Sequence, residues 1–135
     1  MSGPAILKGG CYCGAATYEV EDDFAYSLYC HCSGCRRKTG APYQSIAGIA
    51  IEKLRHAAPE AAYLVHGDEA AHDVHCATCG SLLYASVQNH TRANVAMGTL
   101  IDTPGIRPSL HMFVGSKAPW FEITDDLPQF EELPS

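Results

Sequence analysis

Short runs of alternating apolar and polar residues recur along most of the chain. Thr17–Glu21 is the clearest case, because the apolar Tyr18 and Val20 are each flanked by polar residues. Side chains two residues apart leave a strand on the same face, so this alternation is typical of a strand with one packed and one solvated face. Similar runs predict further strands over residues 26–29, 43–51, 81–87, 94–97 and 110–114.

Glycine and proline residues separate these runs, and helical patterns are rare. The main turn residues are Gly40, Pro42, Gly67, Gly80, Pro104, Gly105, Pro108 and Pro119. One helical turn is predicted over residues 33–38, with Ser33 as its N-cap and Gly40 beyond its end. Residues 60–65 fit either a short helix or an edge strand. The sequence therefore predicts a mainly β fold built from short strands, with little helix.

Length and composition fit one globular domain over residues 1–135. A hydrophobic fraction of 47% with 18% charged residues is ordinary for a packed protein and argues against long disorder. We expect residues 125–135 to cross the surface as a tail. The net charge of -6 disfavours binding to a phosphate backbone, so no nucleic-acid partner is expected. No apolar run approaches the roughly 20 residues that cross a bilayer, so no membrane partner is expected.

Seven cysteines are the strongest chemical signal in the sequence. They form three tight groups: Cys11 and Cys13; Cys30, Cys32 and Cys35; Cys76 and Cys79. Intrachain disulfides alone cannot pair an odd number of cysteines. Residues 1–10 do not have the charged start and apolar centre of a signal peptide, so a cytoplasmic, reducing location is expected. Clustered cysteines in such a compartment favour metal binding over disulfides or redox-active thiols.

The first and last cysteine groups fit one closed metal site. Cys11 and Cys13 leave an extended segment on the same side, and Cys76 and Cys79 bracket a tight turn in which Gly80 can adopt a positive φ. Each pair lacks two ligands of a tetrahedron, and the two pairs together complete it. Such a site would tie the first strand to the middle of the chain. We predict a structural zinc here, while iron, which also binds four thiolates, is not excluded.

The middle cysteine group fits an open metal site. Cys30, Cys32 and Cys35 provide three thiolates, which on a zinc ion leave a fourth position for water or substrate. His31 is the nearest further ligand, but in an extended segment its ring leaves the face opposite its neighbours. We therefore expect His31 to pack, to hydrogen-bond near the site or to contact a ligand, rather than to bind the metal.

The residues around each remaining histidine predict whether it lies in the interior, next to the closed site or on the surface. His111 lies between apolar neighbours in a predicted strand, which indicates an interior histidine that is hydrogen-bonded or serves as a base. His75 precedes Cys76 and is placed to shield the closed site. Surface positions are expected for His56, His66, His72 and His90.

Two further features lie close to these motifs. The basic run Arg36, Arg37 and Lys38 follows Cys35 directly, and it fits either a solvated helical face or a surface that attracts an anionic substrate. Trp120 lies between Pro119 and an aromatic residue, and we expect it to pack in the core or at its rim.

The cysteine motifs and several later segments together form an ordered set. The segments are GCYCG at 10–14, CHCSGCRRK at 30–38, CATCGS at 76–81, GTLID at 98–102, PSLHMFV at 108–114 and SKAPW at 116–120. These segments resemble the glutathione-dependent formaldehyde-activating enzyme family, also called the centromere protein V family. The residue before Cys76 is often aromatic in that family and is His75 here.

This resemblance implies a fold, two zinc ions per chain and an activity. It implies a β-tent fold of short antiparallel strands, a structural zinc at Cys11, Cys13, Cys76 and Cys79, and a second, catalytic zinc at Cys30, Cys32 and Cys35. The implied activity is that of a carbon-sulfur lyase that forms S-hydroxymethylglutathione from formaldehyde and glutathione. On this hypothesis the open zinc binds the glutathione thiol or polarises a carbonyl oxygen, and His31 or His111 moves the proton.

Two other functions are compatible with the same residues. A non-catalytic module stabilised by zinc would bind glutathione or a protein partner without accelerating a reaction. A thiol redox protein would keep a reactive cysteine of low pKa. The sequence does not indicate an oligomeric state.

Overall fold

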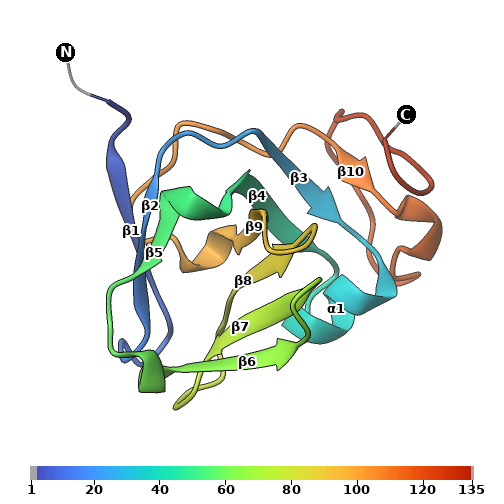
Figure 1. Cartoon of the computed structure of the whole chain (residues 1–135). Coiled ribbons are helices and arrows are strands. Elements are labelled where there is room, and N and C mark those ends of the chain that lie inside the picture. Colours follow the sequence, from blue (N-terminus) through green and yellow to red (C-terminus); the bar gives the residue numbers. More distant parts are fainter. Residues whose placement is uncertain (1–2, 135) are drawn as a thin grey trace.

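The computed structural model describes residues 3–134 as two β-sheets with one α-helix (Figure 1). The smaller sheet has the strand order β1-β2-β5, with β1 at Ile6–Gly10, β2 at Thr17–Glu21 and β5 at Leu54–His56. The larger sheet has the order β10-β3-β4-β9-β8-β7-β6. Its strands are β3 at Tyr26–Cys30, β4 at Gln44–Ala50, β6 at Tyr63–Gly67, β7 at His72–Cys76, β8 at Leu82–Val87, β9 at Arg92–Ala96 and β10 at His111–Met112.

Strand pairing is antiparallel in both sheets except at one edge. The short strand β10 pairs in parallel with β3, with His111 opposite Tyr29 and Met112 opposite Cys30. All other neighbours in the described sheets are antiparallel. The prediction of a mainly β fold of short, largely antiparallel strands is confirmed, and this is the β-tent architecture that the family resemblance implies.

The core lies between the two sheets. From the smaller sheet, Tyr18 and Val20 point inward at alternate positions of β2, as the alternation in the sequence predicts. They pack in one cluster with buried residues of the larger sheet, among them Val74, Leu83 and Val95. A second, smaller cluster of Leu28, Cys30 and Ile46 lies on β3 and β4 and is covered from the side of β10.

Most predicted strands coincide with observed ones, and the differences have local causes. The strand predicted over 110–114 is wrong beyond Met112, because Phe113 adopts a left-handed conformation with φ 58° and a 3-10 turn follows at Val114–Ser116. Strands β1, β5 and β7 were not predicted from the alternation. Residues 60–65 were expected to form either a short helix or an edge strand, and they contain both. A 3-10 turn spans Glu60–Ala62, and the edge strand β6 follows it.

The helix α1 spans Ser33–Thr39 and confirms the predicted turn, but its N-cap differs. The cap is Cys32 rather than Ser33: the Cys32 Sγ accepts a hydrogen bond from the Cys35 N–H at 3.3 Å. At the other end Gly40 takes the left-handed conformation, and its N–H donates to the Arg36 carbonyl. Among the described residues, no helix is long and apolar enough to span a membrane.

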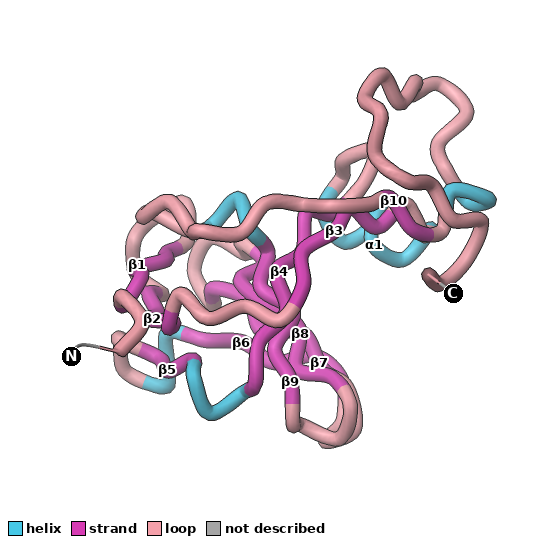
Figure 2. The backbone as a smooth tube through the Cα atoms, turned by 90° about the horizontal axis from the view of Figure 1, so that it is seen from above, coloured by secondary structure: helices cyan, strands magenta, loops and turns pink. Residues whose placement is uncertain are grey.

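The segment after residue 125 crosses the surface as predicted, but it is anchored to β10. The His111 N–H donates to the Pro128 carbonyl, and the Phe130 N–H donates back to the His111 carbonyl, each at 2.9 Å. His111 and Gln129 form a parallel β-bridge. Figure 2 shows this C-terminal part grouped with β10 and α1, away from the smaller sheet.

Gly48 in β4 provides a test of the packing. It lies opposite Tyr26 of β3, and a Cβ added at Gly48 would overlap the Tyr26 ring. Replacing Gly48 with alanine is expected to lower the free energy of unfolding by about 1–3 kcal/mol, because the ring cannot keep its position. Urea denaturation measures this change.

The matched control for that variant is Gly98→Ala. A Cβ at Gly98 would meet no heavy atom within 4 Å, and Gly98 is exposed. We expect its effect to stay within about 0.5 kcal/mol. Equal stabilities of the two variants would contradict the packing that the structure shows.

Candidate metal centres and functional site

The structure brings together two sets of cysteine side chains. Within each set the sulfur atoms all lie within 4.8 Å of one another. The sets are Cys11, Cys13, Cys76 and Cys79, here called the four-cysteine set, and Cys30, Cys32 and Cys35, here called the three-cysteine set. These are the groupings that the sequence spacing predicts.

The four-cysteine set has the dimensions of a tetrahedral thiolate site. The Cys13 sulfur lies 3.7 Å from the sulfurs of both Cys11 and Cys76. Four thiolates at the usual zinc–sulfur bond length would be separated by about 3.8 Å in a regular tetrahedron. Donor type, donor number and spacing therefore fit zinc at this position.

Backbone and hydroxyl groups form hydrogen bonds with three sulfurs of the four-cysteine set. The Ala16 N–H donates to the Cys11 sulfur at 3.2 Å, and the Thr78 N–H donates to the Cys76 sulfur at 3.3 Å. A hydrogen bond with the Ser81 hydroxyl lowers the pKa of Cys79 to about 5. Metal ligands must be deprotonated, so the contact to Cys79 favours metal binding. The pKa of Cys13 is instead raised to about 11, because a backbone hydrogen bond with Ala15, which lowers it, is outweighed by desolvation and the neighbouring sulfurs.

The turn between β7 and β8 places two of these sulfurs. Gly80 has φ 84°, as expected for its position after Cys79, and its N–H donates to the Cys76 carbonyl. His75 does not reach the sulfurs through a hydrogen bond; its Nδ1 lies 3.1 Å from the Gly80 carbonyl oxygen. His75 therefore supports the turn next to the four-cysteine set.

The three-cysteine set lies where β3 ends and α1 begins. Cys30 is the last residue of β3 and is buried, Cys32 caps the helix, and Cys35 lies in its first turn. A hydrogen bond from the Cys35 thiol lowers the pKa of Cys30 to about 6, while the same contact raises the pKa of Cys35. Within residues 3–134 this set contains no fourth histidine, cysteine or carboxylate ligand.

His31 lies between Cys30 and Cys32 in the chain, and its ring bonds to that of His111. Both are buried, with 0% and 2% exposure, and the His31 Nε2 lies 2.8 Å from the His111 Nδ1. His31 is absent from the three-cysteine set, consistent with the predicted direction of its ring. Burial, followed by the nearby charges of His111 and Lys117, lowers the pKa of His31 to about 4.

The structure adds Asp125, a residue that the sequence did not single out. Its Oδ2 and Oδ1 lie 2.9 Å and 3.1 Å from the His111 Nε2, and Oδ1 also accepts the Leu127 N–H. The hydrogen bond with His111 is the main reason why the pKa of Asp125 is lowered. The sequence held no signal for the contact, because it depends on how the 117–127 loop folds back onto β10.

Aromatic rings surround the histidine pair. The Tyr43 ring lies 5.2 Å from the His31 ring and 5.6 Å from the Phe121 ring, and Tyr29 stacks on His111 at 4.9 Å. The prediction that Trp120 packs in the core or at its rim is wrong: its side chain is 73% exposed. Its neighbour Phe121 takes the packed position.

The structure confirms only some of the other predicted surface features. Arg37 and Lys38 are exposed, and Lys38 pairs with Asp73 at 3.1 Å, which offsets part of the positive charge of the basic run. His66 and His90 are exposed as expected. His56 is not a simple surface residue, because it is half-buried and its Nε2 lies 2.7 Å from the Tyr84 hydroxyl.

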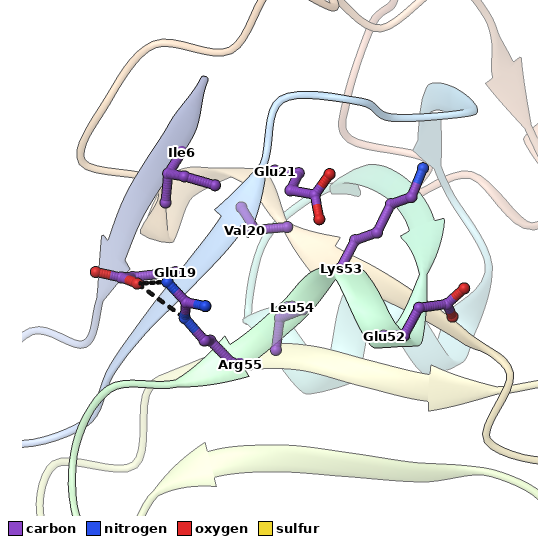
Figure 3. Close-up of a pocket in the computed structure, with 8 residues that line it drawn as sticks. All are labelled: Ile6, Glu19, Val20, Glu21, Glu52, Lys53, Leu54 and Arg55. Carbon is purple, nitrogen blue, oxygen red and sulfur yellow. Dashed lines mark hydrogen bonds and ion pairs between the residues drawn. The ribbon is translucent and has the colours of Figure 1, made fainter. Parts of the chain in front are cut away.

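A pocket on the smaller sheet does not resemble a ligand site. It lies over β2 and β5, has a volume of about 50 Å³ and contains the Arg55–Glu19 ion pair (Figure 3). Pockets for small molecules usually measure about 300–1,000 Å³. None of the cysteines lines this pocket.

Comparisons with known proteins agree with this geometry. The model of the family "Glutathione-dependent formaldehyde-activating enzyme" matches residues 6–116. A Halomonas elongata protein named "Putative glutathione-dependent formaldehyde-activating enzyme" is 27% identical over 127 residues, covering 87% of this chain and 81% of that protein. A crystal structure of a Rhodobacter sphaeroides protein superposes with a TM-score of 0.59 at 31% identity, covering 76% of this chain and 92% of that one.

The matched region includes both cysteine sets, His31 and His111. It ends before Asp125 and most of the C-terminal segment that anchors to β10. Because the match covers most of the sequence, the chain belongs to the glutathione-dependent formaldehyde-activating enzyme family.

Proposed function

We propose that this protein is a zinc-dependent enzyme of the carbon-sulfur lyase type that forms S-hydroxymethylglutathione from glutathione and formaldehyde. The three-cysteine set carries this proposal, because it offers three sulfur ligands and no fourth protein ligand among the described residues. Membership of the family supports the choice of glutathione and formaldehyde as substrates. A cytoplasmic location suits thiol substrates and remains a prediction.

The proposal assigns different roles to the two cysteine sets. The four-cysteine set would hold a structural zinc, since all four positions of a tetrahedron are filled by protein sulfurs. The three-cysteine set would hold a second zinc. A zinc ion bound there supplies an open position that stabilises a thiolate or polarises a carbonyl oxygen.

The reaction is an addition that requires proton movement but no electron transfer. The glutathione thiol loses its proton, its sulfur forms a bond to the formaldehyde carbon, and the carbonyl oxygen takes up a proton. A free thiol near pKa 8.5 is mostly protonated at neutral pH, so a nearby acceptor assists the first step. His31 and His111 are the proposed groups for this proton, because His31 lies between Cys30 and Cys32 in the chain and its ring bonds to that of His111.

The aromatic and basic surroundings suit a thiol peptide. Tyr43 and Phe121 shield the histidine pair from solvent. Arg37 remains exposed at the end of α1, where it can attract the carboxylates of glutathione. Because Lys38 is paired with Asp73, its contribution to this attraction is smaller than the sequence indicates.

Metal analysis tests the division into a structural and a functional site. Purified protein is expected to carry two zinc ions, and both Cys76→Ser and Cys32→Ser should lower the content to about one. Cys76→Ser should also lower the free energy of unfolding by about 4 kcal/mol or more, because it opens the site that joins distant segments. Elemental analysis and denaturation measure the two effects; equal stability of the two variants would contradict the division.

Kinetics of adduct formation test the activity. Cys32→Ser keeps an N-cap for α1, because serine is a favoured cap, but it removes one sulfur of the three-cysteine set. We expect the protein-accelerated rate to fall about 100-fold or more in this variant, as measured by exchange NMR with glutathione and formaldehyde. Ser33→Ala, which alters the adjacent residue and no sulfur, is the control and should retain the rate.

The alternative is a non-catalytic module that binds glutathione or a protein partner. It predicts that glutathione is depleted in proportion to the protein, with no acceleration at substoichiometric amounts. Acceleration in Cys32→Ser equal to that of the unmodified protein would refute the enzymatic proposal.

A further inference from the structure

Two histidine rings outside both cysteine sets lie against each other where two hairpin turns meet. His72 is the first residue of β7, and His90 lies in the turn between β8 and β9. The two rings stack, with centroids 5.4 Å apart and planes inclined by 28°. The Asn89 N–H donates to the Ala70 carbonyl at 3.0 Å, which joins this turn to the one between β6 and β7. The histidine pair is therefore formed by two connected turns.

An oxygen atom holds the Nδ1 of each ring. The His72 Nδ1 lies 2.8 Å from the Asp68 carbonyl oxygen, which can only accept, so this nitrogen carries a proton and donates it. In the neutral ring the other nitrogen, Nε2, then keeps a free lone pair. The His90 Nδ1 bonds to the Ser86 hydroxyl, which can accept in the same way. Histidines that bind a metal commonly donate their other ring N–H to such an oxygen.

The position of Ser86 fixes the pair. Ser86 is fully buried in β8 and lies opposite His72 where β7 pairs with β8. Its bond to His90 holds that ring against the strand that carries His72. Gln88, Asn89 and His90 have φ values of 53°, 57° and 61°, a left-handed conformation that such residues rarely adopt. Unfavourable backbone conformations of this kind cluster at ligand sites, and here they bring His90 back over Ser86.

The spacing of the rings suits one shared metal ion. Two imidazoles that bind one ion through Nε2 in a tetrahedron, at the usual zinc–nitrogen bond length, have centroids about 5 Å apart. The observed 5.4 Å between the centroids of His72 and His90 is close to that value. Neither Nε2 forms a hydrogen bond with another described residue.

The pair also lines an open hollow that offers oxygen ligands. The hollow has a volume of about 510 Å³ and is lined by Glu69, His72, Asn89 and His90. This leaves room for an ion and for water molecules bound to it. Imidazole nitrogen combined with carboxylate oxygen is a donor set for zinc and related divalent metals. The exposed Glu69 is not gathered as tightly as the cysteine sulfurs, so its side chain must turn inward to bind.

We propose that His72 and His90 bind a divalent transition-metal ion of the zinc type through their Nε2 atoms, with Glu69 as the third ligand. The site is separate from both cysteine sets and does not depend on the proposed enzymatic activity. The bound ion joins the β6–β7 turn to the β8–β9 turn. Two neutral imidazoles and one exposed carboxylate hold zinc less firmly than four thiolates, so this ion exchanges with solution.

Titration of Zn²⁺ into protein already treated with zinc and then desalted tests the proposal. We expect calorimetry to show one further ion per chain. His72→Ala and His90→Ala should each weaken its binding about 100-fold or more, because loss of an outer contact alone costs about 10–100-fold. Ser86→Ala, which removes only such an outer contact, should weaken it about 10-fold. The matched control is His66→Ala, since His66 is exposed and its ring lies beside His75 instead.

The ¹⁵N NMR signals of the histidine rings identify the ligands directly. Addition of Zn²⁺ should shift the Nε2 signals of His72 and His90, while the Nδ1 of each ring stays protonated. Unchanged Nε2 signals, or binding weakened as much by His66→Ala as by His90→Ala, would overturn the proposal. Because the signals come from these two rings, the result stands whether or not the cysteine sets hold zinc.

Discussion

The pairing of β3 with a strand on each side is the constraint on which the candidate site depends. β3 is joined to β4 in the larger sheet and to β10 at its edge, and its last residue is Cys30. The parallel register places His111 opposite Tyr29, two residues before His31 in the chain. Because the chain turns directly from β3 into α1, this one strand sets the positions of all three cysteines and of the histidine pair.

A metal bound to each cysteine set would stabilise the chain in a different way. Cys13 and Cys76 are 63 residues apart, so a metal bound to the four-cysteine set would close a long loop and restrict the unfolded chain. The three-cysteine set lies within one strand end and one helical turn, so a metal there constrains little beyond that turn. A protein built this way can alter the chemistry at the second set with a smaller effect on the stability of the whole.

Sequence reasoning succeeded where spacing along the chain decides geometry. Alternation located β2, β3, β4, β8 and β9, and cysteine spacing gave both sulfur sets. It failed for features that depend on contacts between residues far apart in the chain. Trp120 is exposed because the 117–127 loop turns Phe121 inward instead, and Cys32 rather than Ser33 caps α1 because its sulfur already faces the helix. The sequence places Asp125 in a surface tail, since its bond to His111 exists only when the tail pairs with β10.

The bond between Asp125 and His111 links the buried histidine pair to a mostly exposed segment. Residues 125–134 are mostly exposed, and their described attachment to β10 consists largely of backbone hydrogen bonds. Segments with few buried apolar contacts open locally at a lower free energy than the core. Opening of this segment would remove the only carboxylate that bonds to His111 in the described structure, while both cysteine sets stay in place. The order of the C-terminal segment therefore controls the carboxylate contact of a buried histidine, without any change at the sulfurs themselves.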